Sequence, residues 1–136
     1  MLVAVALLVQ GCAITGSVTG ARGWTVGTTD SSGNTATTEI NDTSGLVRDV
    51  QLDPPDARPG PVVAVAPGQP NAVDVTWAAG VCDDRTTIDI AAAGAGLVVT
   101  VRRHQPDRPC DAMAMQRVIR LALRQPIAPG LIAVHQ

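Results

Sequence analysis

The sequence predicts an all-β fold, a small antiparallel β-sandwich of about seven strands formed by residues 46–136. Short apolar runs in this region alternate with polar residues at a period of two. Pro, Gly and Asp break the chain between these runs, at the spacing of about 8–12 residues that is typical of sandwiches. The runs are also rich in Val, Ile and Thr, which favour strands.

The clearest element is the run 73–79, in which the odd positions are apolar and the even ones include Asp74 and Thr76. This alternation indicates a strand with one buried face. The run 86–92 repeats the pattern, and Gly94-Ala95-Gly96 then turns the chain. In chain order, the predicted strands are 46–52, 62–65, 73–79, 86–92, 97–101, 117–124 and 131–135.

Residues 112–124 fit two interpretations. Asp111 could cap a helix that ends before Pro126, since the intervening residues are good helix formers. As a strand, Ile119, Leu121 and Leu123 would share one face. We favour the strand, because the neighbouring elements are strands and a lone helix would need a sheet face to cover.

This pattern resembles the immunoglobulin-like and fibronectin-type sandwiches of bacterial secreted proteins. The resemblance rests on strand number and spacing alone. It implies an architecture and no particular activity.

Composition narrows the function classes. With 10 Lys and Arg against 12 Asp and Glu, the formal charge is −2, which argues against nucleic acid and against attachment to a membrane by charge alone. Phe and Tyr are absent, so Trp24 and Trp77 are the only aromatic side chains. A core of small aliphatic residues buries less area per side chain, which increases the need for a covalent crosslink.

The N-terminus points to export. Residues 2–9 are an uninterrupted apolar run, too short to span a bilayer but suited to a signal peptide. The run ends in Val9-Gln10-Gly11-Cys12, which resembles the lipobox of bacterial lipoproteins. The resemblance implies that 1–12 is a signal segment, that Cys12 is lipidated, and that the protein is anchored on the extracytoplasmic face of a membrane. A cytosolic strand and an ordinary cleaved signal peptide are the alternatives.

Residues 13–45 have a different composition, since 19 of these 33 positions are Gly, Ser or Thr. Such a segment buries little surface to offset its ordering entropy. We therefore expect a flexible tether between the anchor at Cys12 and a folded domain at 46–136.

The two remaining cysteines, Cys82 and Cys110, form an even pair for an oxidising compartment. We expect a disulfide between them. A redox pair or a thiol nucleophile is the alternative, but the spacing is not that of a CxxC motif.

Neither catalytic nor metal-binding residues are predicted. His104 and His135 are the only histidines, and no zinc-ligand spacing surrounds them. His104 could act as a base beside an aspartate, but no nucleophile accompanies it. The candidate aspartates are Asp83, Asp84, Asp107 and Asp111.

Two further motifs have ordinary structural interpretations. Arg117, Arg120 and Arg124 could bind an anion, but a run of charge more often protects an edge strand from aggregation. The Gly-rich turn at 94–96 precedes no helix that could hold a phosphate, so no cofactor is expected.

The sequence therefore predicts a lipid-anchored, non-catalytic module of the cell envelope that binds another protein or a glycan, or has a structural role there. An accessory or inhibitory lipoprotein acting on a secreted enzyme is the main alternative. A small hydrolase would need a pocket with converging polar groups. A spacer or a subunit of a larger assembly is the fourth possibility.

Overall fold

The structure is a computed structural model and describes residues 14–16, 22–29, 33, 35–80, 82–106 and 114–136. These parts of the chain contain ten strands and one short 3-10 helix. The elements are β1 (Ile14–Gly16), β2 (Arg22–Thr29), β3 (Thr35–Asp42), β4 (Val47–Leu52), β5 (Val63–Ala66), β6 (Gln69–Gly80), β7 (Arg85–Ala93), β8 (Gly96–His104), β9 (Ala114–Leu123), η1 (Pro129–Leu131) and β10 (Ile132–His135).

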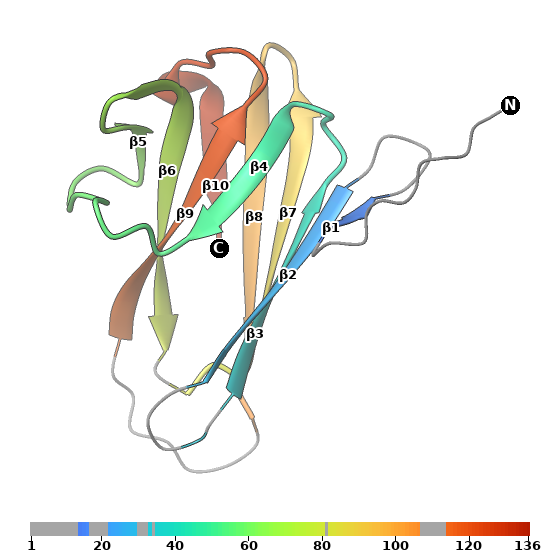
Figure 1. Cartoon of the computed structure of the whole chain (residues 1–136), viewed down its shortest axis with the longest axis vertical. Helices are drawn as coiled ribbons and strands as arrows, with labels where there is room; N and C mark the ends of the chain where they lie inside the picture. The colour runs from blue at the N-terminus through green and yellow to red at the C-terminus, as the bar shows by residue number, and fades with distance from the viewer. Residues whose placement is uncertain (1–13, 17–21, 30–32, 34, 81, 107–113) are drawn as a thin grey trace, which may run out of the picture.

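The strands form two sheets that pack face to face (Figure 1). The six-stranded sheet has the order β1-β2-β3-β7-β8-β10, and the four-stranded sheet has the order β4-β9-β6-β5. Most neighbouring strands are antiparallel, whereas β3 pairs with β7, and β8 with β10, in parallel. The predicted β-sandwich is confirmed, and β4 to β10 correspond to the seven strands expected in residues 46–136.

The expectation of a flexible tether over residues 13–45 is wrong for β2 and β3. These strands pair along all eight residues of each, and β3 also pairs with β7 inside the larger sheet. Trp24 and Ile40 are buried in the common core. The composition was misleading because threonine, which is abundant here, is β-branched and favours strands as well as linkers.

The core lies between the sheets and is filled by alternate positions of each strand. In β6 the predicted inward positions Val73, Val75, Trp77 and Ala79 are all buried. Trp24 approaches from the other sheet, so both aromatic residues of the chain lie in the core. Aliphatic side chains supply the rest, as the composition predicted.

Residues 114–123 form a strand, as we favoured, and not a helix. Because β9 lies between β4 and β6, it is a central strand, so the interpretation of its arginines as protection for an edge is wrong. The three arginines do not share one surface either. Arg117 lies opposite Trp77 on the inner face, Arg120 lies opposite Asp74 on the outer face, and Arg124 follows the strand.

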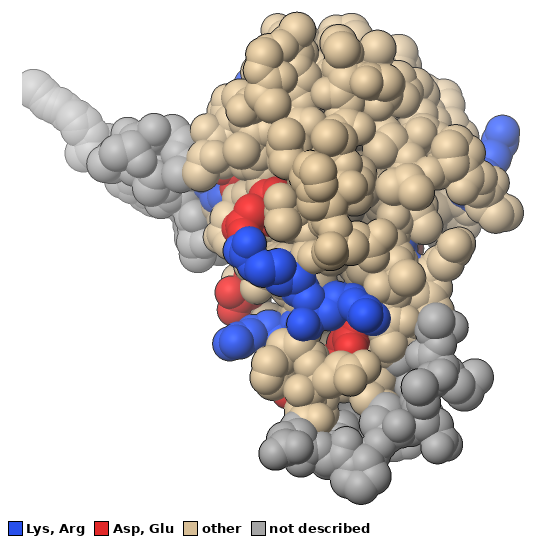
Figure 2. Space-filling view, turned by 180° about the vertical axis from the view of Figure 1, so that it is seen from behind, with Lys and Arg blue, Asp and Glu red and all other residues tan. Residues whose placement is uncertain are grey.

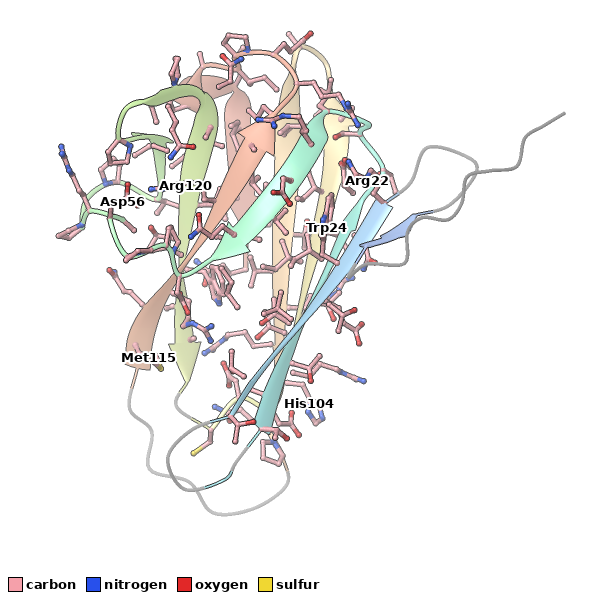
Figure 3. All side chains as sticks on the ribbon, in the orientation of Figure 1. Arg22, Trp24, Asp56, His104, Met115 and Arg120 are labelled. Atoms are coloured by element: carbon pink, nitrogen blue, oxygen red, sulfur yellow. The ribbon has the colours of Figure 1, made fainter. Side chains whose placement is uncertain are left out.

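The outer face of the four-stranded sheet carries a buried ion pair. Arg120 Nε donates to Asp74 Oδ1 at 2.7 Å, and its Nη2 donates to Asp74 Oδ2 at 2.9 Å. From the connection between β4 and β5, Asp56 reaches over this face and accepts a third bond from Arg120 Nη1 at 2.7 Å (Figure 3). Asp74 therefore points outward as predicted, yet it is buried because the connection covers it.

Candidate functional site

A hollow of about 580 Å³ opens between the sheets at one end of the sandwich. It lies where β2 and β6 end and where β3, β7 and β9 begin, at the end away from the turn between β7 and β8 (Figure 1). Its lining is rich in hydroxyl groups, with six threonines drawn from three strands. These are Thr28, Thr29, Thr35, Thr37, Thr38 and Thr86.

The hollow exists because the inward positions change character along the strands. In β7, Ile88 and Ile90 are fully or almost fully buried, and the inward position before them is Thr86. In β3, Ile40 is preceded in the same phase by Thr38. Both threonines are at least nine-tenths buried, yet they are shorter than isoleucine and carry a polar group. The two sheets are therefore not sealed by large apolar side chains at this end.

Arg117 forms the charged wall on the side of the four-stranded sheet. Its guanidinium carbon lies 5.9 Å from the centroid of the Trp77 ring. Its Nη2 and Nε lie 2.6 Å and 2.7 Å from Asp53 Oδ2. Asp53 Oδ1 also accepts the backbone N–H of Val118 at 3.1 Å. The arginine is thus held between an aromatic ring and a carboxylate, so its charge is already balanced.

The loop after β6 places a buried carboxylate in the lining of the hollow. The side chain of Asp83 is only 5% exposed. Its Oδ2 accepts the backbone N–H of Gly80 at 2.8 Å and a bond from Arg103 at 3.3 Å. Its Oδ1 has no hydrogen-bond partner among the described residues. A buried carboxylate oxygen without a partner is costly, which marks Asp83 as a candidate contact for a ligand that donates.

Gly80 fits this loop because a side chain would crowd it. A Cβ atom at position 80 would lie 3.0 Å from Asp83 Oδ1 and 3.1 Å from Gln105 Nε2. The tight approach lets the Gly80 N–H reach the carboxylate.

The structure brings His104 to Asp84, one of the four aspartates that the sequence suggested as its partner. His104 Nδ1 lies 2.6 Å from Asp84 Oδ1, and this hydrogen bond holds the pKa of Asp84 below its usual value. The side chains are 57% and 40% exposed, and His104 is not part of the lining of the hollow (Figure 3). The geometry is that of a surface ion pair. Asp107 and Asp111 lie outside the described residues.

In the parts of the chain that the structure describes, no three His, Cys, Asp or Glu side chains are grouped to hold a metal ion. Cys82 is half-buried and contributes to the lining of the hollow. Cys12 and Cys110 lie outside the described residues, so the lipidation of Cys12 and the pairing of Cys82 with Cys110 stay predictions.

Charge is distributed unevenly on the surface. On the face seen in Figure 2, basic side chains gather in a band with acidic ones beside them, and above this band blue side chains are seen only at the margins. Described ion pairs between β8 and neighbouring segments include Arg102 with Asp89 and Arg103 with Asp83. The basic groups are thus partly neutralised by adjacent acids.

Sequence reasoning missed Thr38 and Thr86 as residues of a site, and it considered Arg117 only as part of an anion-binding run of arginines. A usable signal was present, because each occupies the inward phase of a strand whose next inward residue is isoleucine. A polar residue that continues a buried period-two pattern indicates a polar group between the sheets. Asp53 joins the site through tertiary contact, and no local pattern indicates that contact.

Comparisons with protein-family models, curated proteins and solved structures return no match. In the described residues, no helix is long and apolar enough to cross a membrane. The site itself must therefore carry the functional argument.

Proposed function

We propose that the chain is a lipid-anchored, non-catalytic binding module of the bacterial cell envelope, and that its ligand occupies the hollow between the sheets. The observation that carries this proposal is the change of the inward positions from isoleucine to threonine at one end. A sandwich stabilised only by its core would fill these positions with apolar side chains. Hydroxyl groups with a few charges are typical of the polar contacts that orient a ligand.

The anchor is supported by the apolar run 2–9 and by its position directly before Val9-Gln10-Gly11-Cys12. Oxidising surroundings would allow Cys82 to form a disulfide, and an even pair of cysteines remains for this once Cys12 is lipidated. We assign Cys110 as its partner, because the proposal commits Cys12 to the lipid.

The corrected strand boundaries change how the module would be presented. Ile14, the first residue of β1, comes two positions after Cys12, so at most about 7 Å of chain separates their Cα atoms. The module would therefore sit close to the headgroups, and a long tether would not hold it away from the membrane.

The charged groups at the hollow are already engaged with one another, which favours a binding role over a catalytic one. Arg117 is paired with Asp53, and Asp84 with His104 on the surface. The groups that line the hollow are suited to binding and orienting a ligand.

Intact mass of the membrane-associated protein tests the anchor. We expect a diacylated Cys12 at the N-terminus and no alkylation of Cys82 or Cys110 before reduction. Retention of Met1 with three alkylated thiols would overturn the export argument.

A hollow-filling variant tests the binding site. Ala36 lines the hollow and is half-buried, so Ala36→Met should fill it and Ala36→Ser should leave it open. Immobilised peptides and soluble glycans are screened against the protein. A ligand of the hollow binds wild type and Ala36→Ser, and loses at least about tenfold in affinity with Ala36→Met. If every ligand found binds Ala36→Met equally well, the hollow is not the site.

A further inference from the structure

We propose that the open edge of β2, at residues 25–29, binds an extended segment of a partner protein as an added β-strand, with a basic side chain of that segment in the hollow. This inference rests on the proposed function of the hollow as a binding site. It specifies the ligand as an extended peptide, whose backbone would bond to the edge of β2 and whose basic side chain would enter the hollow.

Among the described residues, the edge is open along most of its length. On the side away from β3, β1 pairs with β2 only at residues 22–24. On the other side, β3 pairs with β2 through to Thr29. No other described strand lies along residues 25–29. This stretch therefore resembles the sheet edges that accept peptides by β-augmentation.

The hydrogen-bonding direction of β2 follows from its neighbour. Thr37 N donates to Asp84 O at 3.0 Å, and Thr43 N donates to Ile90 O at 2.9 Å, so odd-numbered residues in and after β3 point their backbone groups at β7. Even-numbered residues of β3 must then point theirs at β2. Since Thr38 lies opposite Val26, the even residues of β2 bond to β3. The N–H and C=O groups of Thr25, Gly27 and Thr29 are left facing the open edge.

A strand added at this edge would place every second side chain in the hollow. Side chains on paired strands share the phase of the residues opposite them. Trp24 and Val26 point toward the core, so Thr28, two residues further along, points between the sheets and lines the hollow. Residues of an added strand opposite Val26 and Thr28 would therefore point the same way.

Charge decides which side chain fits there. The lining contains Asp53, Asp83 and Asp84 but only Arg117 as a cation. That arginine is already paired with Asp53. Asp83 keeps one buried oxygen without a partner among the described residues. A lysine or arginine side chain from the added strand would supply the missing donor to Asp83, beside the bond that its other oxygen accepts from Arg103.

The edge also lacks the usual protection. Edge strands are commonly guarded by charges or prolines, which discourage unwanted pairing. The edge strand β5 is flanked by Pro61 and Pro67. Residues 25–29 read Thr-Val-Gly-Thr-Thr, with no charge and no proline. An edge left unguarded beside a polar hollow fits a role in binding.

The test uses two nine-residue peptides of alternating residues, one of threonine and lysine and one of threonine and glutamate. The protein carries Cys12→Ser so that binding is measured without a membrane. Titration followed by backbone amide shifts should show the lysine peptide perturbing residues 25–29. The glutamate peptide should bind at least about tenfold more weakly, and Asp83→Asn should reduce this preference.

Gly27 allows a matched pair of variants. Gly27→Pro removes an N–H that faces the open edge. Because this N–H is not bonded to β3, a proline at position 27 leaves the hydrogen bonds between β2 and β3 intact. Gly27→Ala keeps the N–H, and a Cβ there meets nothing within 4 Å. We expect about a tenfold loss of lysine-peptide affinity for Gly27→Pro and less than about twofold for Gly27→Ala. Thr29→Pro against Thr29→Ser repeats the comparison if Gly27→Pro does not fold.

Three results would overturn the inference. Unchanged peptide binding by both proline variants would exclude the edge. Protection of the Thr25, Gly27 and Thr29 amides from exchange without peptide would mean that residues before Ile14 or a second copy occupy the edge, and sedimentation separates these two. Binding of glycans alone, lost with Ala36→Met, would exclude a peptide ligand while leaving the proposed function standing.

Discussion

Asp74 and Arg120 face each other across neighbouring strands and join through two parallel hydrogen bonds, on the outer face of a sheet where both are buried. The direct register of Asp74 with Arg120 places them side by side. Asp56 adds a third bond from above. Together these acids raise the pKa of Arg120, so the guanidinium stays charged throughout the accessible pH range.

Breaking this pair should destabilise the fold. Asp74→Ala leaves Arg120 buried with one fewer partner, at a cost of about 3–5 kcal/mol in the free energy of unfolding. Replacing both residues, as Asp74→Val with Arg120→Met, should cost much less because no buried charge remains. Denaturant unfolding of Asp74→Val, of Arg120→Met and of the double variant measures this. A loss in the double variant equal to the sum of the two single losses would show that the pair is not coupled.

Two carboxyls should make the stability depend on acid pH. A hydrogen bond from Arg120 lowers the pKa of Asp56, and one from His104 lowers the pKa of Asp84. A carboxyl whose pKa is lowered in the folded state stabilises that state at pH values above its unfolded pKa of about 3.9. This stabilisation is lost as the pH falls through the lower pKa of the folded state. We therefore expect stability to decrease below about pH 4.

Carboxyl-carbon NMR titration measures both groups directly. In His104→Ala the pKa of Asp84 should rise toward the ordinary aspartate value while that of Asp56 stays low. A midpoint for Asp84 that does not move in this variant would show that His104 is not the cause.

The sequence predicted the sandwich because alternation of buried residues is a local property. Residues 73–79 illustrate this, since Val73 and Trp77 were placed inward from the pattern alone and are buried. The N-terminal strands β2 and β3 show the same alternation, but their high content of glycine and threonine favours a linker. Trp24, Val26 and Thr28 follow the inward phase of β2, yet the glycines and threonines around them were interpreted as linker.

The candidate site was harder to predict because its residues meet only through tertiary contacts. Asp53 lies 64 positions before Arg117, and Asp83 reaches Arg103 across 20 positions. No local pattern indicates such pairs. The pairing of His104 with Asp84 was among the alternatives raised from the sequence, but whether it lay in a cleft or on the surface depended on the fold.

Trp24 tests whether the N-terminal strands belong to the folded unit. The side chain is 5% exposed and packs in the core, so Trp24→Ala should lower the free energy of unfolding by about 3–5 kcal/mol. Thr25→Ala, at the next and exposed position of β2, should change it by less than about 0.5 kcal/mol. If residues 22–42 were only a tether, neither substitution would matter.

Removal of the proposed disulfide should weaken the end of the sandwich that holds the hollow. A bond from Cys82 to Cys110 closes a loop of about 29 residues, which the chain-entropy model values at about 3–4 kcal/mol. Cys110→Ser should lower the unfolding free energy by this amount, and reductant should lower that of wild type equally while leaving Cys110→Ser unchanged. Cys12→Ser is the matched control and should unfold like wild type in both conditions. Because Cys82 lines the hollow beside Asp83, Cys110→Ser should also bind the lysine peptide more weakly than the protein with an intact crosslink. A wild type that is insensitive to reductant would refute the crosslink and with it the argument for an oxidising compartment.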